Sequence, residues 1–435
     1  MRRWMLSGVS AALLAGSVAD ASAGAFGIRE QSTEAQGLAF AGTASGSGGV
    51  SSMFWNPATV TMRPGWVTEQ NLSLINLSGK IRPEAGTNPA FARLGDSGDI
   101  GQGAVVPAGA TSYQVNDRLW VGIQTGAPFG LVTKPRDTWA GELYGRSNRI
   151  FTLAFNPVIG FKVNEWLSIA AGPNIEYFKL TLKQAQITGV PFNPANLSSS
   201  ILKGDSWGVG FTAGVLVTPW AGTAFGVGYR SSVHHDIEGS LRLPGAASVL
   251  GGPVVANLNT PEKVTVGLTQ AINPVTRVNF GFEWDNWSRL KDVAIVPVFA
   301  GRAGSALPLF YKDGFTYAVG AEYDWSPNLT VRAGVAYEVS PIDFENRSVR
   351  LPDNNRVNVS VGANYRWNEK LTLTFAYSHF FVERGRILAG PGRDYNVQNV
   401  VFAGLADSSA DIVSVGFRYI LGEPAVAAAP IVRKF

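Results

Sequence analysis

Short segments in which apolar and polar residues alternate occupy most of the chain, from Trp66 to Leu421. In the segment Leu329 to Tyr337 the odd positions are Leu, Val, Ala, Val and Tyr, and the even positions are Thr, Arg, Gly and Ala. Leu371 to Tyr377 repeats this pattern. Successive side chains of a β-strand point to opposite faces of a sheet, so each segment is predicted to be a strand with one apolar and one polar face.

The spacing of these segments predicts a closed barrel. We expect fourteen strands, at residues 66–80, 104–115, 118–127, 149–162, 166–183, 205–218, 222–239, 261–272, 275–292, 311–324, 328–340, 354–367, 370–385 and 410–421. The connections are alternately tight turns, such as 116–117, and long gaps, such as 128–148. Bacterial barrels have short periplasmic turns, long outer loops and an even number of strands. The pattern therefore predicts an all-β, fourteen-stranded antiparallel transmembrane β-barrel over residues 66–421.

Charged residues in the polar set decide which face meets lipid. Sliding the strands by one residue would turn Arg332, Arg366 and Glu322 outward, and an Arg at the bilayer midplane costs roughly 2–4 kcal/mol. The apolar set is therefore expected outside. The inner wall is then expected to carry charges of both signs, from Arg230, Lys263, Glu283, Glu322, Arg332, Glu338, Arg366 and Arg418. Six tryptophans lie at strand ends beside the short turns, as in an interfacial aromatic girdle: Trp66, Trp120, Trp166, Trp220, Trp325 and Trp367.

Both ends of the chain carry signals of export. Residues 1–23 have the features of a signal peptide, with Arg2 and Arg3, an apolar run from Met5 to Ala19, and the small residues Ala21-Ser22-Ala23 as a cleavage site. An exported β protein without a helical anchor is expected in the outer membrane of a Gram-negative bacterium. The pattern Ser414-x-Gly416-x-x-Tyr419-x-Leu421 resembles the signal read by the barrel assembly machinery, and an extension, 422–435, follows it.

Composition and residue pairs argue against other kinds of function. The chain has no cysteine, which excludes disulfides and thiolate chemistry, and its net charge of +4 is too small to indicate a nucleic-acid partner. His234 and His235 are neighbours on a predicted strand and point to opposite faces, so they do not indicate a metal site. Ser378 and His379 fail as a catalytic pair for the same reason. We expect a monomer that is no enzyme and uses neither a metal nor a cofactor.

Residues 24–65, between the signal peptide and the first strand, are predicted to form a hatch. They are rich in Gly, Ala and Ser, show no strand alternation, and contain Arg29, Glu30 and Glu34. About eight strands is the limit for a barrel filled by its own side chains, so a fourteen-stranded barrel needs something else to close its lumen. A compact segment folded back inside, with charges paired to the inner wall, would do this. The alternative is a disordered periplasmic arm.

Several short motifs follow one another along the mature chain. They are Gly24-Ala25-Phe26 with Gly37-Leu38-Ala39-Phe40-Ala41-Gly42, Trp55-Asn56-Pro57-Ala58, Pro128-Phe129-Gly130-Leu131 with Trp139-Ala140-Gly141, Lys312-Asp313-Gly314-Phe315 with Gly320-Ala321-Glu322-Tyr323, and Arg332-Ala333-Gly334 before Ser340-Pro341. In this order they resemble the FadL-type outer-membrane transporters of long-chain fatty acids and other hydrophobic compounds. The resemblance implies a fourteen-stranded barrel with an N-terminal hatch, an outer groove built by loops, and an inner apolar pocket.

The resemblance also implies roles for individual residues. Phe26 would line the inner pocket, and Asn56, Pro57 and Ala58 would form the hatch motif. The third strand of the family is kinked and opens laterally to the bilayer, and Gly122, Gly126 and Pro128 would mark that gate here. The outer groove would be lined by Phe129, Leu131, Trp139, Phe192 and Leu197. Basic residues that could meet a carboxylate are Arg146, Arg149 and Lys179.

The expected function is passive uptake of hydrophobic molecules, foremost long-chain fatty acids, through an apolar pocket that the hatch gates and that empties sideways at strand three. Outer-membrane lipid and lipopolysaccharide would surround the protein. Aromatic hydrocarbons are an alternative ligand class. A general diffusion porin is the alternative function, and residues 24–65 discriminate between the two, because a porin would conduct without their removal.

Overall fold

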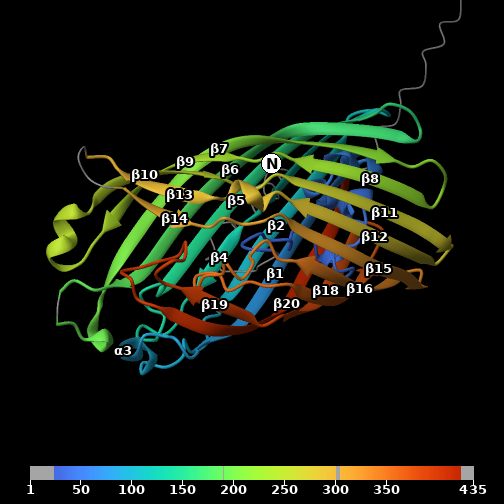
Figure 1. The fold of residues 1–435 in the computed structure, drawn as a ribbon. Helices are drawn as coiled ribbons and strands as arrows, with labels where there is room; N and C mark the ends of the chain where they lie inside the picture. Colours follow the sequence, from blue (N-terminus) through green and yellow to red (C-terminus); the bar gives the residue numbers. More distant parts are fainter. Residues whose placement is uncertain (1–23, 190, 300–303, 423–435) are drawn as a thin grey trace, which may run out of the picture.

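The strands form one closed antiparallel barrel in the computed structural model, which describes residues 24–189, 191–299 and 304–422 (Figure 1). β1 (Trp66–Pro83) pairs with both β2 (Gly103–Gln114) and β20 (Phe402–Gly422), and this closes the sheet. The predicted 14-strand antiparallel barrel is confirmed. The predicted signal peptide and residues 423–435 of the predicted extension lie outside the described residues.

The remaining strands continue around the barrel and beyond it on the loop side. They are β3 (Leu119–Gly126), β4 (Gly130–Thr133), β5 (Ser147–Lys162), β6 (Leu167–Gln186), β7 (Ser198–Val217), β8 (Thr223–Arg230), β9 (His234–Arg242), β10 (Gly252–Asn259), β11 (Lys263–Asn273), β12 (Thr276–Asp285), β13 (Asp292–Pro297), β14 (Ser305–Pro308), β15 (Gly314–Ser326), β16 (Leu329–Val339), β17 (Arg356–Arg366), β18 (Leu371–Val382) and β19 (Gly385–Ala389). The predicted strand 275–292 runs too far, because β12 ends at Asp285 and η7 (Trp287–Arg289) follows it, and the predicted strand 222–239 is divided into β8 and β9. The short strands β4, β10, β13, β14 and β19 lie almost entirely in segments predicted as long gaps. Two strands were predicted to start too late, because β7 begins at Ser198 and β20 at Phe402. The added residues lack regular apolar alternation, since they extend past the lipid-facing band.

The helices are short. Four lie between the first described residues and β1, namely α2 (Thr33–Gln36), η2 (Thr43–Ser45), η3 (Gly49–Phe54) and η4 (Pro57–Met62). The others lie in loops, namely α3 (Pro89–Ala92), η5 (Pro194–Asn196), η6 (Gly245–Leu250) and η7 (Trp287–Arg289). Among the described residues, no helix has both the length and the hydropathy needed to cross a bilayer.

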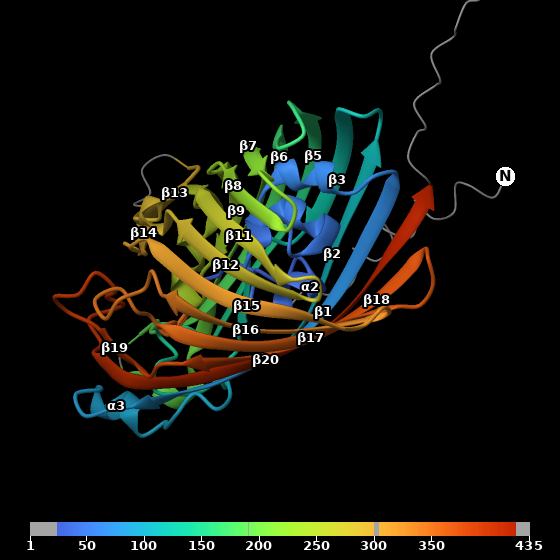
Figure 2. The same cartoon turned by 90° about the vertical axis from the view of Figure 1, so that its right-hand side faces the viewer.

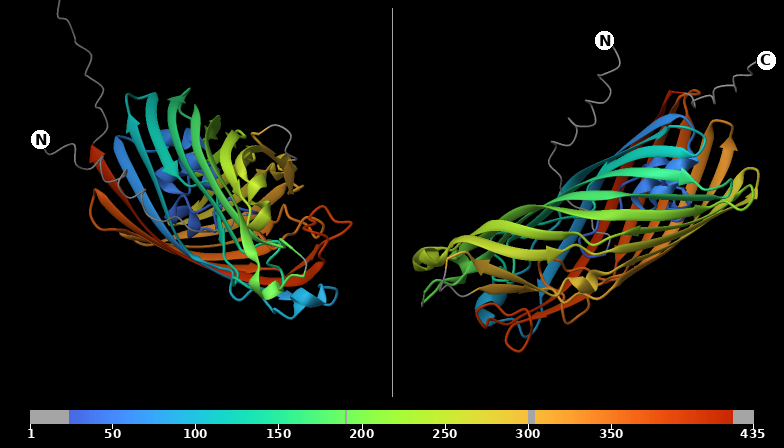
Figure 3. Two further views of the ribbon diagram at one scale, coloured as in Figure 1. Left: turned by 90° about the vertical axis from the view of Figure 1, so that its left-hand side faces the viewer. Right: turned by 90° about the horizontal axis from the view of Figure 1, so that it is seen from above.

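The apolar face of the barrel points outward, as predicted. On β16, Val335 and Tyr337 are exposed, whereas Arg332 and Glu338 are buried. The inward charges form ion pairs, and Arg332 Nε lies 3.0 Å from Glu322 Oε2. The short turns gather at one end of the barrel and the long loops at the other (Figure 3). Tryptophans exposed near the short turns are Trp66, Trp166, Trp220, Trp325 and Trp367.

Trp120 departs from the predicted girdle. Its side chain is buried, its Nε1 donates to the backbone oxygen of Arg63 at 3.0 Å, and the ammonium group of Lys162 lies 4.6 Å from the centre of one of its rings. Alternation along the strand explains this position, because Trp120 shares the inward parity of β3. It therefore anchors the end of the N-terminal segment to the wall.

The N-terminal segment, residues 24–65, lies inside the barrel (Figure 2). α2 contacts β17, β18 and β20, η2 contacts β8 and β11, and η4 contacts β5, β6 and β7. The approach is close enough to require glycine in the wall: a Cβ at Gly228 would lie 1.8 Å from the backbone oxygen of Trp55. The segment thus fills the lumen and touches the wall on opposite sides.

Candidate ligand-binding site and gate

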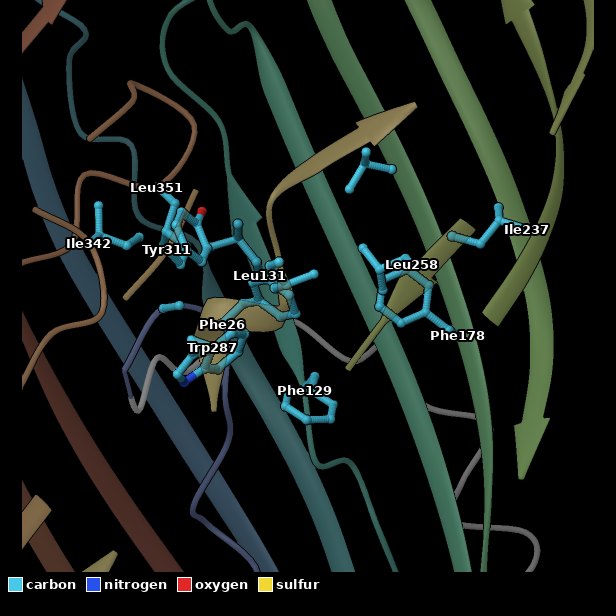
Figure 4. Close-up of a cluster of buried hydrophobic side chains, with 13 residues drawn as sticks. Phe26, Phe129, Leu131, Phe178, Ile237, Leu258, Trp287, Tyr311, Ile342 and Leu351 are labelled. Carbon is cyan, nitrogen blue, oxygen red and sulfur yellow. The ribbon is translucent and has the colours of Figure 1, made fainter. Parts of the chain in front are cut away.

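Three aromatic rings from distant parts of the chain meet inside the barrel (Figure 4). The ring centroids of Phe26 and Trp287 are 4.8 Å apart, those of Phe26 and Phe129 are 5.9 Å apart, and those of Phe129 and Trp287 are 5.8 Å apart. All three side chains are buried. Leu131 packs into the same group, which we call the inner apolar cluster; its other buried members are Ala25, Phe178, Ile237, Leu258, Leu290, Val293, Tyr311, Ile342 and Leu351.

The inner apolar cluster contains residues that are expected from the sequence at two separate sites, an inner pocket and an outer groove. Phe26, which is expected at an inner pocket, lies in the inner apolar cluster. Phe129 and Leu131 are expected in the outer groove, but the structure places them beside Phe26. They lie there because the chain leaves β3 at Gly126 and turns into the lumen before it resumes as β4. An apolar guest that reaches Phe26 would therefore meet them at the same point.

Trp287 is the member of the cluster that sequence reasoning missed. It lies on η7, between β12 and β13, and its buried Nε1 has no hydrogen-bond partner among the described residues. A buried donor without a partner costs about 1–3 kcal/mol, so an acceptor on a guest molecule would be favourable here. The sequence does hold one signal for Trp287. It follows the loop-side end of β12, whereas the tryptophans of the aromatic girdle lie beside the short turns.

The wall of the barrel is interrupted beside the cluster. β2 pairs with β3 only from Gly109 to Gln114, whereas Gly103–Ala108 pairs with β1 alone within the described part of the chain. β4 pairs with β5 and with no strand on the β2 side among the described residues. Gly126 and Pro128, which the resemblance assigns to a gate, lie at this interruption, since β3 ends at Gly126 and β4 begins at Gly130. Gly122 does not belong to it, because it pairs regularly with Ser112.

Residues 26–28 of the N-terminal segment fill this interruption from inside. Ile28 N donates to Pro128 O at 2.8 Å, Gly130 N donates to Phe26 O at 2.8 Å, and an antiparallel bridge links Gly27 with Phe129. These residues therefore act as a short strand against the segment between β3 and β4. Backbone amides that leave a sheet inside a membrane protein need such partners.

Two side chains of the N-terminal segment complete the seal. Ile28 packs with Ala104 and Val106 of β2 and with Ala127, so it closes the inner side of the gap. Gln31 Nε2 donates to the backbone oxygen of Ala127 at 2.8 Å. A Cβ at Gly126 would lie 1.9 Å from Gln31 Oε1, so a larger residue at this position would displace the Gln31 amide. No motif in the sequence marks Ile28 or Gln31 as functional residues.

A buried ion network holds this part of the N-terminal segment. Arg29 Nη1 lies 3.0 Å from Glu338 Oε1, and Arg29 Nε lies 3.4 Å from Glu283 Oε1. Lys263 Nζ lies 2.7 Å from Glu283 Oε1 and 3.1 Å from Asp285 Oδ1. Arg29 is thus the segment's link to carboxylates on two separate strands of the wall.

Replacing Arg29 by Gln is expected to destabilise the folded protein markedly. The substitution leaves Glu338 and Glu283 with less positive charge while they stay buried, and breaking a buried ion pair in this way costs about 3–5 kcal/mol. The measurement is the thermal unfolding midpoint of the detergent-solubilised protein, followed by circular dichroism and by gel mobility. Arg29→Lys is the matched control, because it keeps the charge; equal midpoints for wild type and Arg29→Gln would contradict the assigned role.

The Asn-Pro-Ala motif ties the segment to the opposite wall. Asn56 Oδ1 accepts from Ala58 N at 3.0 Å and caps η4, whose first residue is Pro57. Asn56 Nδ2 donates to Ala44 O at 2.7 Å and to Val215 O at 2.9 Å. The motif therefore joins two parts of the N-terminal segment to β7, and none of its residues belongs to the inner apolar cluster.

A second buried cluster lies under the outer loops. Trp139 is fully buried, and its Nε1 donates to Gly145 O at 3.0 Å. Leu197 packs at the edge of this cluster, and the ring of Phe192 stacks on Phe91 at 6.0 Å. Trp139, Phe192 and Leu197 thus lie in the outer loops, as expected, away from Phe129 and Leu131. Trp139 is enclosed, whereas Phe192 is exposed at the surface.

None of the three basic candidates lies at the inner apolar cluster. Arg146 is engaged in the outer loops, where its guanidinium bonds to Glu142 and donates to Leu197 O at 2.8 Å. Burial raises the pKa of the Glu142 carboxyl, against the opposing effect of Arg146. Arg149 and Lys179 are exposed on β5 and β6, next to inward-facing Asn148 and Phe178. They therefore point to the outside of the barrel.

The histidines that invite other chemistry point in opposite directions. His234 is exposed and its Nδ1 lies 2.9 Å from Asn259 Oδ1, while His235 is buried with its Nε2 3.1 Å from Glu176 Oε1. His379 contacts Asp411 on the outer face at 2.7 Å, whereas the neighbouring Ser378 is buried. Each neighbouring pair is divided between the two faces of its strand, as the sequence predicts.

Known proteins share this architecture. Residues 13–420 match the family described as outer membrane protein transport protein (OMPP1/FadL/TodX). The chain is 24% identical over 409 residues to the long-chain fatty acid transport protein of Escherichia coli strain K12, covering 84% of this chain and 90% of that protein. It is 27% identical over 440 residues to a 47 kDa outer membrane protein of Pasteurella multocida, covering 94% and 96%.

Solved structures show the same fold. A Pseudomonas aeruginosa FadL homologue is similar with a TM-score of 0.81 at 23% identity, covering 91% of this chain and 99% of that one. The Pseudomonas putida toluene transporter TodX is similar with a TM-score of 0.67 at 17% identity, covering 90% and 98%.

Proposed function

The chain belongs to the outer membrane transport protein family of FadL and TodX, and on this premise we propose that it admits hydrophobic molecules by passive diffusion through a gate beside strand three. The protein is an outer-membrane protein of a Gram-negative bacterium, and its family transports hydrophobic compounds. The route and the ligand are the parts that this proposal adds.

The observation that carries the proposal is the pairing of Phe26, Gly27 and Ile28 with the segment 128–130. The same three residues contribute a ring to the inner apolar cluster and a side chain to the seal of the wall. A guest that displaces Phe26 from Phe129 and Trp287 would therefore also loosen the seal. Binding and opening become coupled, because the ligand has higher affinity for the state in which residues 26–28 have moved.

Sideways release fits the energetics of such a cargo. Burying each CH₂ group gains about 0.8 kcal/mol, so an apolar cluster captures a hydrocarbon chain without an energy source. Returning the same chain to water would cost that amount again. Exit between β2 and the residues after β3 would lead the chain from the inner apolar cluster directly into the hydrocarbon of the bilayer. This route avoids the cost of passing through water.

Two ligand classes fit the site, each on its own ground. Long-chain fatty acids are proposed first, because several relatives that match 84% of this chain are named long-chain fatty acid transport protein. Monoaromatic hydrocarbons are the second candidate, because three aromatic rings form the site and the nearby Arg29 and Lys263 are already paired with carboxylates. A fatty acid carboxylate would have to compete with Glu283 and Glu338 for these cations.

Growth and binding measurements distinguish the two classes. A strain lacking the protein is expected to grow slowly on oleate as sole carbon source and normally on toluene if fatty acids are the cargo. The reverse result would assign aromatic hydrocarbons. Mass spectrometry of the detergent-purified protein gives an independent readout of the bound compound. Normal growth on both substrates, with slower entry of small polar solutes, would favour the porin alternative.

A further inference from the structure

The strands β5, β6, β7 and β9 are neighbours in the wall of the barrel (Figure 1). Strand alternation places five basic residues on the outer face of their loop-side parts. They are Arg149 of β5, Lys179 and Lys183 of β6, Lys203 of β7 and Arg242 of β9, and we call them the basic face. Alternation sets their direction: the neighbours of Lys179, Phe178 and Leu180, pack in or against the inner apolar cluster. Lys179 therefore points the other way, to the outside.

Strand register brings the five side chains together. Arg149 and Lys203 lie in one cross-strand row, separated by the single residue of β6 that pairs with both. Lys183 and Arg242 lie in the next row outward, separated by one residue of β7. Lys179 lies in the row below. With strands about 4.8 Å apart and alternate residues about 6.7 Å apart, the face spans roughly 15 Å by 13 Å.

An aromatic edge separates the basic face from the lipid-facing wall. The rings of Tyr177 and Trp207 are 5.1 Å apart, and those of Tyr177 and Phe151 are 6.4 Å apart. Farther from the loops the outward residues are apolar, as at Phe155 and Val209, which are exposed. Aromatic residues flank the apolar band of outer-membrane barrels at both interfaces. The basic face therefore lies at the level of the head groups of the outer leaflet.

Four of the five cations of the basic face lack an ion-pair partner within the described part of the chain. Among the described residues, Lys179, Lys183, Lys203 and Arg242 have no carboxylate within ion-pair distance. The acidic side chains on the same face are Asp205 and Glu238, and Asp205 accepts a hydrogen bond from Tyr177 Oη at 3.2 Å. Cations packed this closely repel one another, so an anion from outside the chain would stabilise them.

In another sector of the loop side, four basic residues have acidic partners. The pairs are Lys80 with Asp96 at 3.4 Å, Arg82 with Asp407 at 3.8 Å, Arg384 with Asp407 at 3.3 Å and Arg386 with Glu84 at 3.4 Å. These lie on or next to β1, β18, β19 and β20, away from the basic face. Cations without an acidic partner are thus gathered on the basic face and not in this paired sector.

We propose that the basic face is a binding site for the phosphate groups of lipid A, the phosphorylated glycolipid of the outer leaflet. Its phosphates lie at the boundary between acyl chains and sugars, the level that the aromatic edge defines. Clusters of Lys and Arg beside a membrane-embedded surface bind anionic lipid head groups through charge complementarity. The acyl chains would lie along the apolar wall below the aromatic edge. Arg149 and Lys179 thereby serve the lipid partner and not the transported ligand.

The test uses the full-length mature protein in a neutral detergent and fluorescent lipid A. The variant Lys179→Gln/Lys183→Gln/Lys203→Gln/Arg242→Gln is expected to bind on the order of a hundredfold more weakly than wild type. The matched control, Lys80→Gln/Arg82→Gln/Arg384→Gln/Arg386→Gln, removes the same number of charges from the paired sector and is expected to bind like wild type. Lipid A without phosphates is expected to bind wild type as weakly as the first variant binds phosphorylated lipid A.

Two outcomes would overturn the proposal: equal losses in the two variants, or equal affinity of wild type for lipid A with and without phosphates. Heat-modified gel mobility checks that each variant is folded. If the fourfold variant does not fold, the pairs Lys179→Gln/Lys203→Gln and Lys183→Gln/Arg242→Gln are measured in its place, and unchanged affinity in both pairs would refute the site. Affinity of wild type is also expected to fall as salt rises, because exposed charges are screened.

Discussion

Linking residue 27 to residue 129 by a disulfide is expected to stop uptake of the hydrophobic ligand. In the variant Gly27→Cys/Phe129→Cys the new cysteines occupy facing positions of an antiparallel bridge. Their Cα separation then falls within the range that a disulfide spans, about 4.4–6.8 Å. The bond holds residues 26–28 against the segment 128–130, so the gate cannot open. Uptake of radiolabelled oleate and of toluene by cells should fall by at least about tenfold.

The native chain has no cysteine, so the engineered pair forms the single disulfide of the variant and its reduction is unambiguous. A reductant should restore uptake to the level of the two single-cysteine variants, which control for loss of the Phe129 ring. A variant that transports equally well oxidised and reduced would show that residues 26–28 need not leave the wall. Transport would then follow another route, and the proposed gate would be wrong.

The barrel could be predicted from sequence because lipid imposes a simple rule on each strand. Val335 and Tyr337 face hydrocarbon, and Arg332 and Glu338 face the lumen, so their order along the chain already carries the orientation. The rule weakens where the lumen itself is apolar. On β6, Phe178 and Leu180 face the inner apolar cluster while Tyr177 faces outward. Both faces of this strand therefore carry apolar or aromatic side chains, and hydropathy alone does not show which face points into the lumen. The direction of Lys179 could not be predicted for this reason.

The gate could be predicted only in part. Gly126 and Pro128 mark a break because each disfavours a regular strand, and the break lies there. What fills it depends on contacts across about a hundred residues of sequence, such as Ile28 with Ala127. No local pattern encodes such a contact. Trp287 could not be identified for the same reason, because it becomes part of the site only through contacts with Phe26 and Phe129, which are distant in the sequence.

Removing residues 24–62 is expected to turn a closed barrel into an open pore. The deleted residues contact the wall on opposite sides of the lumen, and the wall they leave behind is lined with charges such as Arg230, Glu283 and Glu338. A fourteen-stranded barrel is too wide for its own side chains to close, so water and ions would enter. In planar bilayers the truncated protein should show steady ohmic conductance, at least about tenfold above that of the intact protein, as expected of an unplugged barrel.

The truncation also separates the two functions that the sequence leaves open. An intact protein that already conducts as strongly as the truncated one would be a diffusion porin, and its N-terminal segment would not be a hatch. If the truncated protein is folded, as judged by gel mobility, but shows no conductance, the outer loops and not residues 24–62 close the lumen. Arg29→Gln offers an intermediate case: it keeps the segment but loosens its link to Glu338, so brief openings on a closed baseline are expected. The frequency of such openings would measure how firmly that buried ion network holds the hatch in the lumen.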